Sequence, residues 1–427
     1  MSKYKKQKST QQSINEINKT EIINTIKENS NISIQGQQNS FPDDLNNNIN
    51  ISELNQITSE EDNLCYNLGY NPPSNNTSLI RDFSEIKPVG LINFNFSCYM
   101  NSCLQCFYHC RLFINEILKI KSGLKFKNAP ITNALIDLID GLISIGSNNS
   151  SPKGYQYPAK KFYDTLIKKY PKFRYSLGND PKAVSSLILL FMPQELKPEF
   201  SYRTDQKINK NNEESLFEDI YDKYNKNLSF FSNNFYWCLK KKKICRNCKK
   251  YKLFTYSFQY NHMHNFYISQ ICKKLRKNSC TLNDCLNFFK EPDEDNSIEF
   301  ICYNCQKKVI ANRILYYMAT LPNYLIICLN DEGALSQYYK LVIKPELNLE
   351  DIFQPPKNYK GSRETNYVFH CGVFIRGAKT HAVAICKHFD KKYYEFDDKN
   401  FEAYDIHRKL RNEIPYLLFY RRKDVPI

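Results

Sequence analysis

The chain has 427 residues, of which 42% are hydrophobic and 14% aromatic, enough for one large globular domain or two smaller ones. Its 60 Lys and Arg residues outnumber 44 Asp and Glu residues, giving a formal net charge of +16. The sequence has no apolar run of about 18 residues and no apolar stretch near Met1, so we expect neither a membrane span nor a secretory signal. The basic charge is compatible with a nucleic-acid partner, but a Lys- and Asn-rich solvated surface explains it more simply.

Residues 1–80 are rich in Asn, Gln, Ser, Lys and Glu and contain few aromatic residues. Such a segment buries too little apolar surface to offset its ordering entropy, so we predict a disordered low-complexity N-terminal tail. Apolar periodicity and aromatic residues begin at about Pro88, which indicates that the folded part starts there.

Within the folded part, helical spacing comes first and strand-like alternation later. Apolar residues recur at helical spacing over Cys98–Lys119, Asn133–Ile145, Tyr163–Lys169 and, later in the chain, Leu282–Lys290. After about Ser229, short alternating apolar runs predict strands over Tyr251–Tyr260, Lys308–Ala319, Asn323–Leu329, Val368–Ile375, Ala382–His388, Lys392–Phe396 and Tyr416–Tyr420. Helices followed by strands predict an α+β fold.

Two CxxC pairs, Cys245/Cys248 and Cys302/Cys305, lie in this β-like region. Together they supply four thiolates, which suit one structural Zn²⁺ ion in a closed tetrahedral shell, and we expect it to hold two hairpin tips together. The alternative is that the pairs are ordinary thiols. Lysine runs at Lys240–Lys243 and Lys249–Lys250 flank the first pair, but no interleaved aromatic residues accompany them, so we do not expect a nucleic-acid partner.

A third cysteine-rich stretch, SCYMNSCLQCFYHC, spans Ser97–Cys110. Cys98 lies at the start of the helical pattern, where the helix dipole favours the thiolate and lowers the thiol pKa. Cys103, Cys106 and Cys110 lie inside the pattern, where free cysteine usually acts as a small buried hydrophobic residue. These cysteines could together bind a metal, but the two CxxC pairs already supply the better site.

The segment Gly90–Phe107, GLINFNFSCYMNSCLQCF, resembles the cysteine box G-L-x-N-x-G-N-T-C-Y-M-N-S-x-L-Q of the ubiquitin-specific proteases, papain-like deubiquitinating enzymes. The histidine box of that family is matched by His370–Gly372, Thr380–Ala384 and YYEFDD at Tyr393–Asp398, and its closing strand by FYRR at Phe419–Arg422. Between the boxes, TLNDCLNFF, LPNYLIICL and KLVIKPELNLEDIF follow in the family's order. The resemblance covers about residues 86–423.

This resemblance implies a catalytic domain with a helical thumb over about residues 88–200, zinc-pinned β fingers over about 230–315 and an antiparallel β palm over about 316–423. It also implies roles for single residues: Cys98 as nucleophile, His381 as base and acid, Asp397 as the residue that orients His381, Asn93 as oxyanion donor and Asp398 as auxiliary. The residues themselves agree with this, since His381 begins an apolar strand and Asp397 follows another, and an antiparallel hairpin would bring them together. Taken singly, each has an ordinary reading as a strand-end or turn residue, and His370 reads as structural.

Several positions depart from the family pattern. The family's G-N-T before the nucleophile is Asn95-Phe96-Ser97, the glycine and tyrosine beside the catalytic histidine are Thr380 and Ala382, and of Q-D-A-x-E-F-L only Asp180 remains, within Asn179–Val184. The K-R-F after the palm strand is Asn330-Asp331-Glu332. Catalytic positions are kept while positions facing the substrate differ.

The resemblance thus implies a thiol protease that hydrolyses the peptide or isopeptide bond after the C-terminal glycine of ubiquitin. Two other hypotheses remain: a catalytically weak or inactive ubiquitin-binding scaffold on the same fold, and a basic zinc-ribbon protein that binds nucleic acid. We expect a monomer that binds ubiquitin or ubiquitinated proteins, needs no membrane, and resides in the cytoplasm or nucleus.

Overall fold

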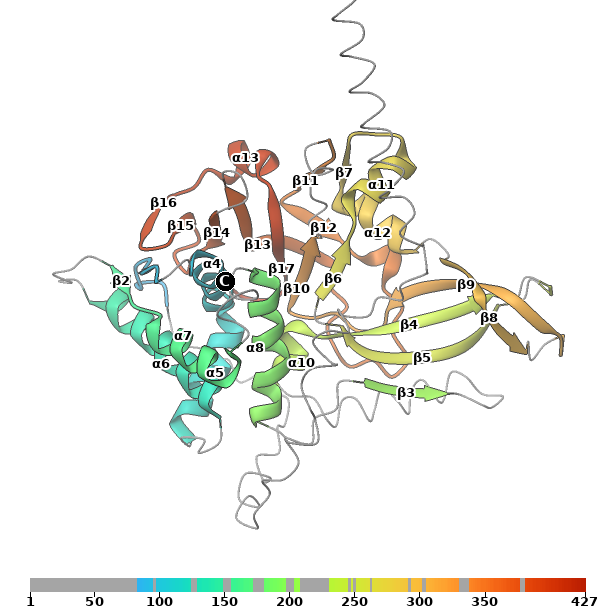
Figure 1. Ribbon diagram of the computed structural model, residues 1–427, viewed down its shortest axis with the longest axis horizontal. Coiled ribbons are helices and arrows are strands. Elements are labelled where there is room, and N and C mark those ends of the chain that lie inside the picture. The colour runs from blue at the N-terminus through green and yellow to red at the C-terminus, as the bar shows by residue number, and fades with distance from the viewer. Residues whose placement is uncertain are drawn as a thin grey trace, which may run out of the picture. The chain divides into compact units, whose positions relative to one another are not determined.

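The computed structural model describes residues 83–94, 97–123, 129–148, 155–171, 180–196, 203–207, 230–244, 247–248, 251–261, 263–290, 293–301, 305–329, 338–376 and 381–427. All of them belong to one compact unit, residues 70–427 (Figure 1). The predicted tail over residues 1–80 lies outside the described residues. Among the helices described, none combines the length and the apolar character needed to cross a membrane.

Helices occupy the first part of this unit, as predicted: α4 (Cys98–Tyr108), α5 (Arg111–Gly123), α6 (Pro130–Ser147), α7 (Lys160–Lys169) and α8 (Pro181–Leu196). The single helix predicted over Cys98–Lys119 is wrong, because the chain leaves the helix at His109 and Cys110 and starts a second one. Both helices bury apolar side chains in the same core, so their periodicity continues across the break.

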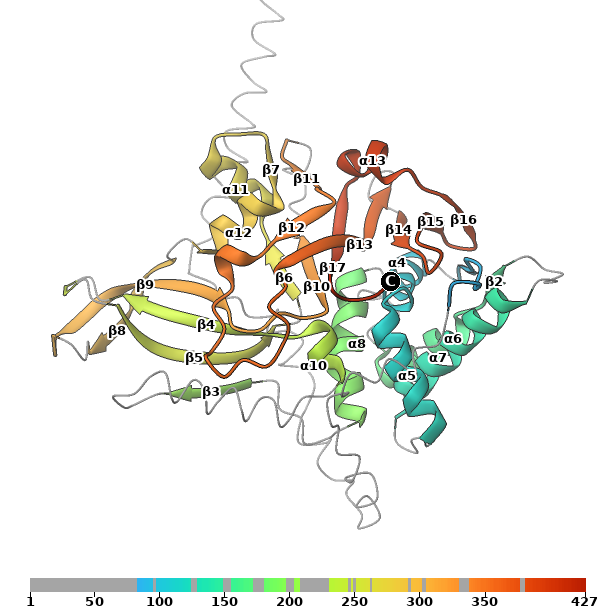
Figure 2. The ribbon, with the colours of Figure 1, turned by 180° about the vertical axis from the view of Figure 1, so that it is seen from behind.

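An antiparallel five-stranded sheet follows, with the order β3 (Arg203–Lys207), β5 (Tyr251–Asn261), β4 (Trp237–Ile244), β9 (Lys308–Met318) and β8 (Asp293–Ile301) (Figure 2). The predicted strands Tyr251–Tyr260 and Lys308–Ala319 are confirmed as β5 and β9. The connections β4–β5 and β8–β9 are the two hairpin tips that carry the CxxC pairs. Cys248 and Cys305 are described there, whereas Cys245 and Cys302 lie outside the described residues.

The second large sheet carries the later predicted strands. Its neighbours are, in order, β16 (Asn400–Ala403), β15 (Tyr393–Asp397), β14 (His381–Lys387), β13 (Asn366–Arg376), β17 (Pro415–Arg422), β10 (Tyr324–Leu329) and β6 (Met263–Phe266), with β12 (Glu346–Asn348) pairing β13. All neighbouring pairs are antiparallel except β10 with β6, which run parallel. The predicted antiparallel palm is therefore confirmed, with one parallel strand added from earlier in the chain.

The central strands of this sheet are buried on both faces. Along β13, β14, β17 and β10, alternate residues pack into two separate apolar cores, one shared with helices α4 to α8 and the other with α11 (Ile268–Leu275) and α12 (Leu282–Lys290). Burial on both faces explains why these strands read as continuous apolar runs such as Tyr324–Leu329. The helix predicted at Leu282–Lys290 is confirmed, whereas α11 and α10 (Phe230–Phe235) interrupt a region whose sequence reads as strand-like.

Smaller elements complete the unit: β1 (Gly90–Leu91), β2 (Gln156–Tyr157), β7 (Ser279–Thr281), β11 (Lys340–Val342), η5 (Glu350–Ile352), α13 (Ile406–Lys409) and η6 (Leu410–Asn412). β1 pairs in parallel with β2, and β7 with β11. The described elements therefore form the predicted α+β architecture of helices, extended antiparallel sheet and central sheet.

Candidate active site

Cys98 is the first residue of α4 and is 4% exposed. The preceding loop is closed by hydrogen bonds between its own residues. Ser97 donates its backbone N–H to Asn93 Oδ1 at 3.0 Å, and the Ser97 hydroxyl accepts the N–H of Phe94 at 2.9 Å. The chain is thereby turned so that α4 starts at Cys98, although Asn95 and Phe96 lie outside the described residues.

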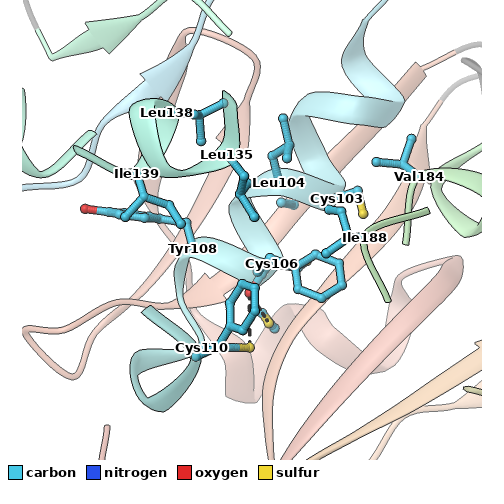
Figure 3. Packing of buried hydrophobic residues seen from close by; sticks show 14 of the residues in the cluster. Cys103, Leu104, Cys106, Tyr108, Cys110, Leu135, Leu138, Ile139, Val184 and Ile188 are labelled. Atoms are coloured by element: carbon cyan, nitrogen blue, oxygen red, sulfur yellow. Dashed lines mark hydrogen bonds between the residues drawn. The ribbon is translucent and has the colours of Figure 1, made fainter. Parts of the chain in front are cut away.

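Helix α4 is buried on nearly all sides, since every residue except Tyr99 is buried. It packs in one core with β13 and β14 on one side and with α8 on another (Figures 1 and 3). The backbone N–H of Ala382, the second residue of β14, donates a hydrogen bond to the Cys98 thiol. This contact places the sulfur beside the second residue of β14, the strand that begins with His381.

His381 and Asp397 come together as the sequence predicts. β14 and β15 are antiparallel, with Ala384 opposite Phe396, so the start of one strand meets the end of the other. His381 donates Nε2–H to Asp397 Oδ1 at 2.6 Å, because an ionised carboxylate can only accept. The side chains of His381 and Asp397 are 33% and 53% exposed. Nδ1 of His381 is left with a lone pair that can take a proton.

Asp398 contacts different residues from those that Asp397 contacts. Its carboxylate accepts from Asn93 Nδ2 at 2.7 Å and from Asn101 Nδ2 at 2.9 Å, and its carbonyl accepts the N–H of Leu91 at 2.8 Å. Asp398 has a φ of 50° in the tight connection between β15 and β16, a conformation that Asp adopts more readily than most residues. It joins the β15–β16 hairpin to the loop and helix that present Cys98.

Burial raises the pKa of the Cys98 thiol above its ordinary value, and this is the largest effect. The N–H groups of Ala382 and Tyr99 oppose burial, whereas the nearby Asp398 carboxylate adds to the rise. The N–H groups at the start of α4 favour the thiolate, as the sequence predicts, but burial outweighs them. A base would therefore have to remove the thiol proton for Cys98 to act as a nucleophile.

The charge of Asp398 gives a test on the pH scale. Since this carboxylate raises the Cys98 pKa, Asp398→Asn is expected to shift the pH dependence of Cys98 alkylation by iodoacetamide to lower pH. The rate at Cys98 is followed by peptide mass spectrometry. Glu402→Gln removes an exposed charge from the same hairpin and is expected to leave the profile in place. An unchanged or alkaline-shifted profile in Asp398→Asn would contradict this electrostatic account.

Gly90 allows β1 to approach the turn that carries Asp398. A Cβ atom at Gly90 would lie 2.2 Å from the Lys399 carbonyl oxygen, which belongs to backbone and cannot swing away. We expect Gly90→Ala to lower the free energy of unfolding by about 1–3 kcal/mol and to reduce catalysis, by displacing the turn. Chemical denaturation and kinetics measure the two effects. In Gly141→Ala in α6, the atoms nearest to the added Cβ belong to the side chain of half-buried Tyr157, so this variant is expected to keep the catalytic rate.

The hairpin tips bring the two halves of the predicted metal site together. Asn247, inside the first CxxC pair, donates Nδ2–H to the Cys305 sulfur of the second pair at 3.5 Å. Cys248 and Cys305 are both half-buried. The described half of this four-cysteine set, Cys248 and Cys305, therefore lies on two tips that are in contact, while Cys245 and Cys302 lie outside the described residues.

The structure also shows where the other cysteine and histidine residues considered in the sequence lie. Cys103, Cys106 and Cys110 are buried, as expected for core thiols. His109 and His370 are buried in the core, and each contacts a backbone carbonyl. Asn101, which sequence reasoning did not single out, bridges α4 to Asp398, and its only signal was its place in the matched segment.

A family model described as ubiquitin carboxyl-terminal hydrolase matches residues 89–420. The structure is similar to a chain of the SAGA Ubp8/Sgf11/Sus1/Sgf73 DUB module bound to ubiquitin aldehyde, with TM-score 0.60, 19% identity, and 82% of this chain and 71% of that chain covered. It is also similar to a chain of the yeast SAGA DUB module carrying a mutant Sgf73, with TM-score 0.54, 17% identity, and coverages of 82% and 70%. At such identities these neighbours show the fold.

Proposed function

Because this chain belongs to the ubiquitin carboxyl-terminal hydrolase family, we propose that it is a deubiquitinating thiol protease that hydrolyses the peptide or isopeptide bond after the C-terminal glycine of ubiquitin. The observation that carries the proposal is the arrangement around His381. Its Nε2–H is held by Asp397 at 2.6 Å, while the Cys98 thiol accepts the N–H of Ala382, the next residue. This arrangement supports the proposal of a nucleophile from α4, a base from β14 and an orienting acid from β15.

The proposed reaction starts from the Cys98 thiol. His381 takes the thiol proton at Nδ1, and the sulfur attacks the carbonyl carbon of the ubiquitin C-terminal glycine. His381 then gives that proton to the leaving amine as the C–N bond breaks, which leaves a thioester on Cys98. Water, deprotonated by His381, hydrolyses the thioester and restores the thiol. Throughout, Asp397 holds the ring and stabilises the imidazolium.

Asn93 is the proposed side-chain donor to the oxyanion. Its amide nitrogen carries two hydrogens, of which one is committed to Asp398 Oδ2 at 2.7 Å and the other is available to the substrate oxygen. Asp398 would therefore act by fixing the orientation of this amide. It is a positioning residue rather than a direct participant in bond breaking.

We also propose that the four cysteines of the hairpin tips hold one structural Zn²⁺ ion. The donor set is the one that zinc prefers, and a closed four-thiolate shell keeps water off the metal. The side-chain contact between Asn247 and Cys305 supports the pairing of the two tips. When bound, the ion would tie the far end of the five-stranded sheet and take no part in hydrolysis.

Ubiquitin is the proposed partner. The SAGA Ubp8 structure that this chain resembles is bound to ubiquitin aldehyde and is assembled with Sgf11, Sus1 and Sgf73. For the present chain the expectation of a monomer stays a prediction, because its neighbours in fold occur in a complex.

The alternative is a ubiquitin-binding scaffold with little activity, favoured by the positions that depart from the family pattern, such as Thr380 and Ala382. The test uses full-length protein and ubiquitin with a C-terminal electrophile that traps a reactive cysteine. We expect one adduct, mapped to Cys98, that Cys98→Ala abolishes and Cys103→Ala keeps. Ubiquitin binding without adduct formation in the wild-type chain would support the scaffold, and absence of both would refute ubiquitin as partner.

A further inference from the structure

A second group of metal-ligand side chains lies inside the core. The sulfur atoms of Cys106, Cys371 and Cys386 lie within 4.8 Å of one another, and so do ligand atoms of Cys110, His370 and Cys371. The four cysteines are 0% exposed and His370 is 1% exposed. These donors come from α4, from the break between α4 and α5, and from β13 and β14, which are far apart in sequence.

Cys371 is the centre of this group. It lies directly opposite Cys386 across the β13–β14 pair, and its thiol is within hydrogen-bonding reach of the thiols of Cys106, Cys110 and Cys386. Cys103 lies apart, since its sulfur contacts the Ser185 hydroxyl at 3.0 Å and points toward Val184 and Ile188 in Figure 3. Of the buried cysteines of α4, the group therefore includes Cys106 but excludes Cys103.

A β-bulge directs both His370 and Cys371 toward the helix. The register of β13 on β17 shifts between Phe369 and Cys371, so His370 is the extra residue. Consecutive residues of a regular strand face opposite sides, yet here His370 contacts the His109 carbonyl and Cys371 contacts the Cys106 carbonyl. Bulges commonly redirect a side chain at a functional position.

The ring of His370 has the hydrogen-bond arrangement that is typical of a metal ligand. Nε2–H donates to the His109 carbonyl at 2.8 Å, which leaves Nδ1 with its lone pair. Nδ1 is buried and, within the part of the chain that the structure describes, has no hydrogen-bond partner. A metal-binding histidine almost always donates its other N–H to a carbonyl or carboxylate, as His370 does. A buried acceptor without a donor otherwise costs free energy.

A buried cation stands nearby. Arg421 is 6% exposed, and its charge acts on His370. Its guanidinium donates to the carbonyls of Arg422 and Val425, and the Asp424 carboxylate interacts with its charge. Three thiolates with one Zn²⁺ carry a net charge of −1, which would add to the stabilisation of this buried cation.

We infer that Cys106, Cys371 and Cys386, with a fourth donor from His370 or Cys110, form a second zinc site beneath the candidate active site. Three cysteines and one histidine are a common structural zinc set, and the two triads share Cys371. The ion would join α4, which begins with Cys98, to β14, which begins with His381. It would therefore fix the spacing between the nucleophile and the base.

The first experiment counts zinc. Full-length protein is purified under reducing conditions from zinc-supplemented culture, passed through metal-free buffer, and its zinc content per chain is measured by mass spectrometry. Cys386→Ala is expected to lose one equivalent relative to wild type, while Cys103→Ala, at an equally buried thiol of the same core, loses none. Equal zinc content in Cys386→Ala and wild type, with circular dichroism unchanged, would overturn the site.

The second experiment keeps the core intact. In Cys248→Ser/Cys305→Ser, where the hairpin-tip site is removed, titration with Co²⁺ is expected to give a thiolate-to-cobalt charge-transfer band that saturates at one equivalent. Absence of this band would show that the buried cysteines are core thiols only and would overturn the inference. Neither readout depends on protease activity, so failure here is distinct from failure of the proposed function.

Discussion

Replacing Cys98 with serine is expected to lower kcat/KM for a ubiquitin C-terminal amide by at least about 10,000-fold. The serine hydroxyl is a far weaker nucleophile than a thiol or thiolate, and a base suited to a thiol cannot remove its proton as readily. The substitution changes one atom at a site that is 4% exposed, so packing and ubiquitin binding should be kept. Release of a fluorescent amine from the ubiquitin C-terminus measures the rate.

The control for this change is Cys103→Ser, which alters a thiol on the same helix whose partner, Ser185, lies in α8. Its rate is expected to stay within about threefold of wild type, with a modest loss of stability. If Cys98→Ser kept even a tenth of the wild-type rate, the nucleophile would have to be another group.

Asp397→Ala should lower kcat by about 100- to 10,000-fold while leaving KM nearly unchanged. Asp397 contacts His381, the proposed base, at 2.6 Å, so its loss is expected to remove the orientation of the ring and the stabilisation of the imidazolium. These are needed in the transition state, whereas substrate binding does not depend on them. Steady-state kinetics with a ubiquitin amide separate the two constants.

Asp397→Asn is the informative comparison, because its side-chain oxygen can still accept the Nε2–H of His381. It should retain more activity than Asp397→Ala. The double variant His381→Ala/Asp397→Ala should be little worse than His381→Ala alone, since the two residues act as a unit. Additive losses, or equal rates for the Ala and Asn variants, would show that Asp397 acts independently of His381.

Much of the fold follows from local pattern. The strands that meet at the candidate site were predictable because β13, β14 and β17 are apolar along their length, and β15 ends in a polar turn. The juxtaposition of His381 with Asp397 followed from a hairpin argument, since antiparallel neighbours bring a strand start to a strand end. The link to Cys98 needed the family motif, because no local rule joins a helix start to strands so distant in sequence.

What could not be predicted depends on tertiary packing. The dipole of α4 is visible in the sequence, but the burial of Cys98 and the nearby Asp398 charge, which reverse the direction of its pKa shift, are not. The break at His109 and Cys110 was hidden because two helices share one core. The bulge at His370 and the parallel pairing of β6 with β10 depend on strand register, which periodicity does not encode.

The adjacent carboxylates of Asp397 and Asp398 serve separate groups, one holding His381 and the other holding Asn93 and Asn101. Neither can substitute for the other, since a shift of one residue along the hairpin would exchange or lose both sets of contacts at once. The β15–β16 connection is therefore a spacer of fixed length: insertions and deletions there should be tolerated far less than in other surface turns. In redesign, this turn has to be transplanted together with β1 and the start of α4, as one inseparable module.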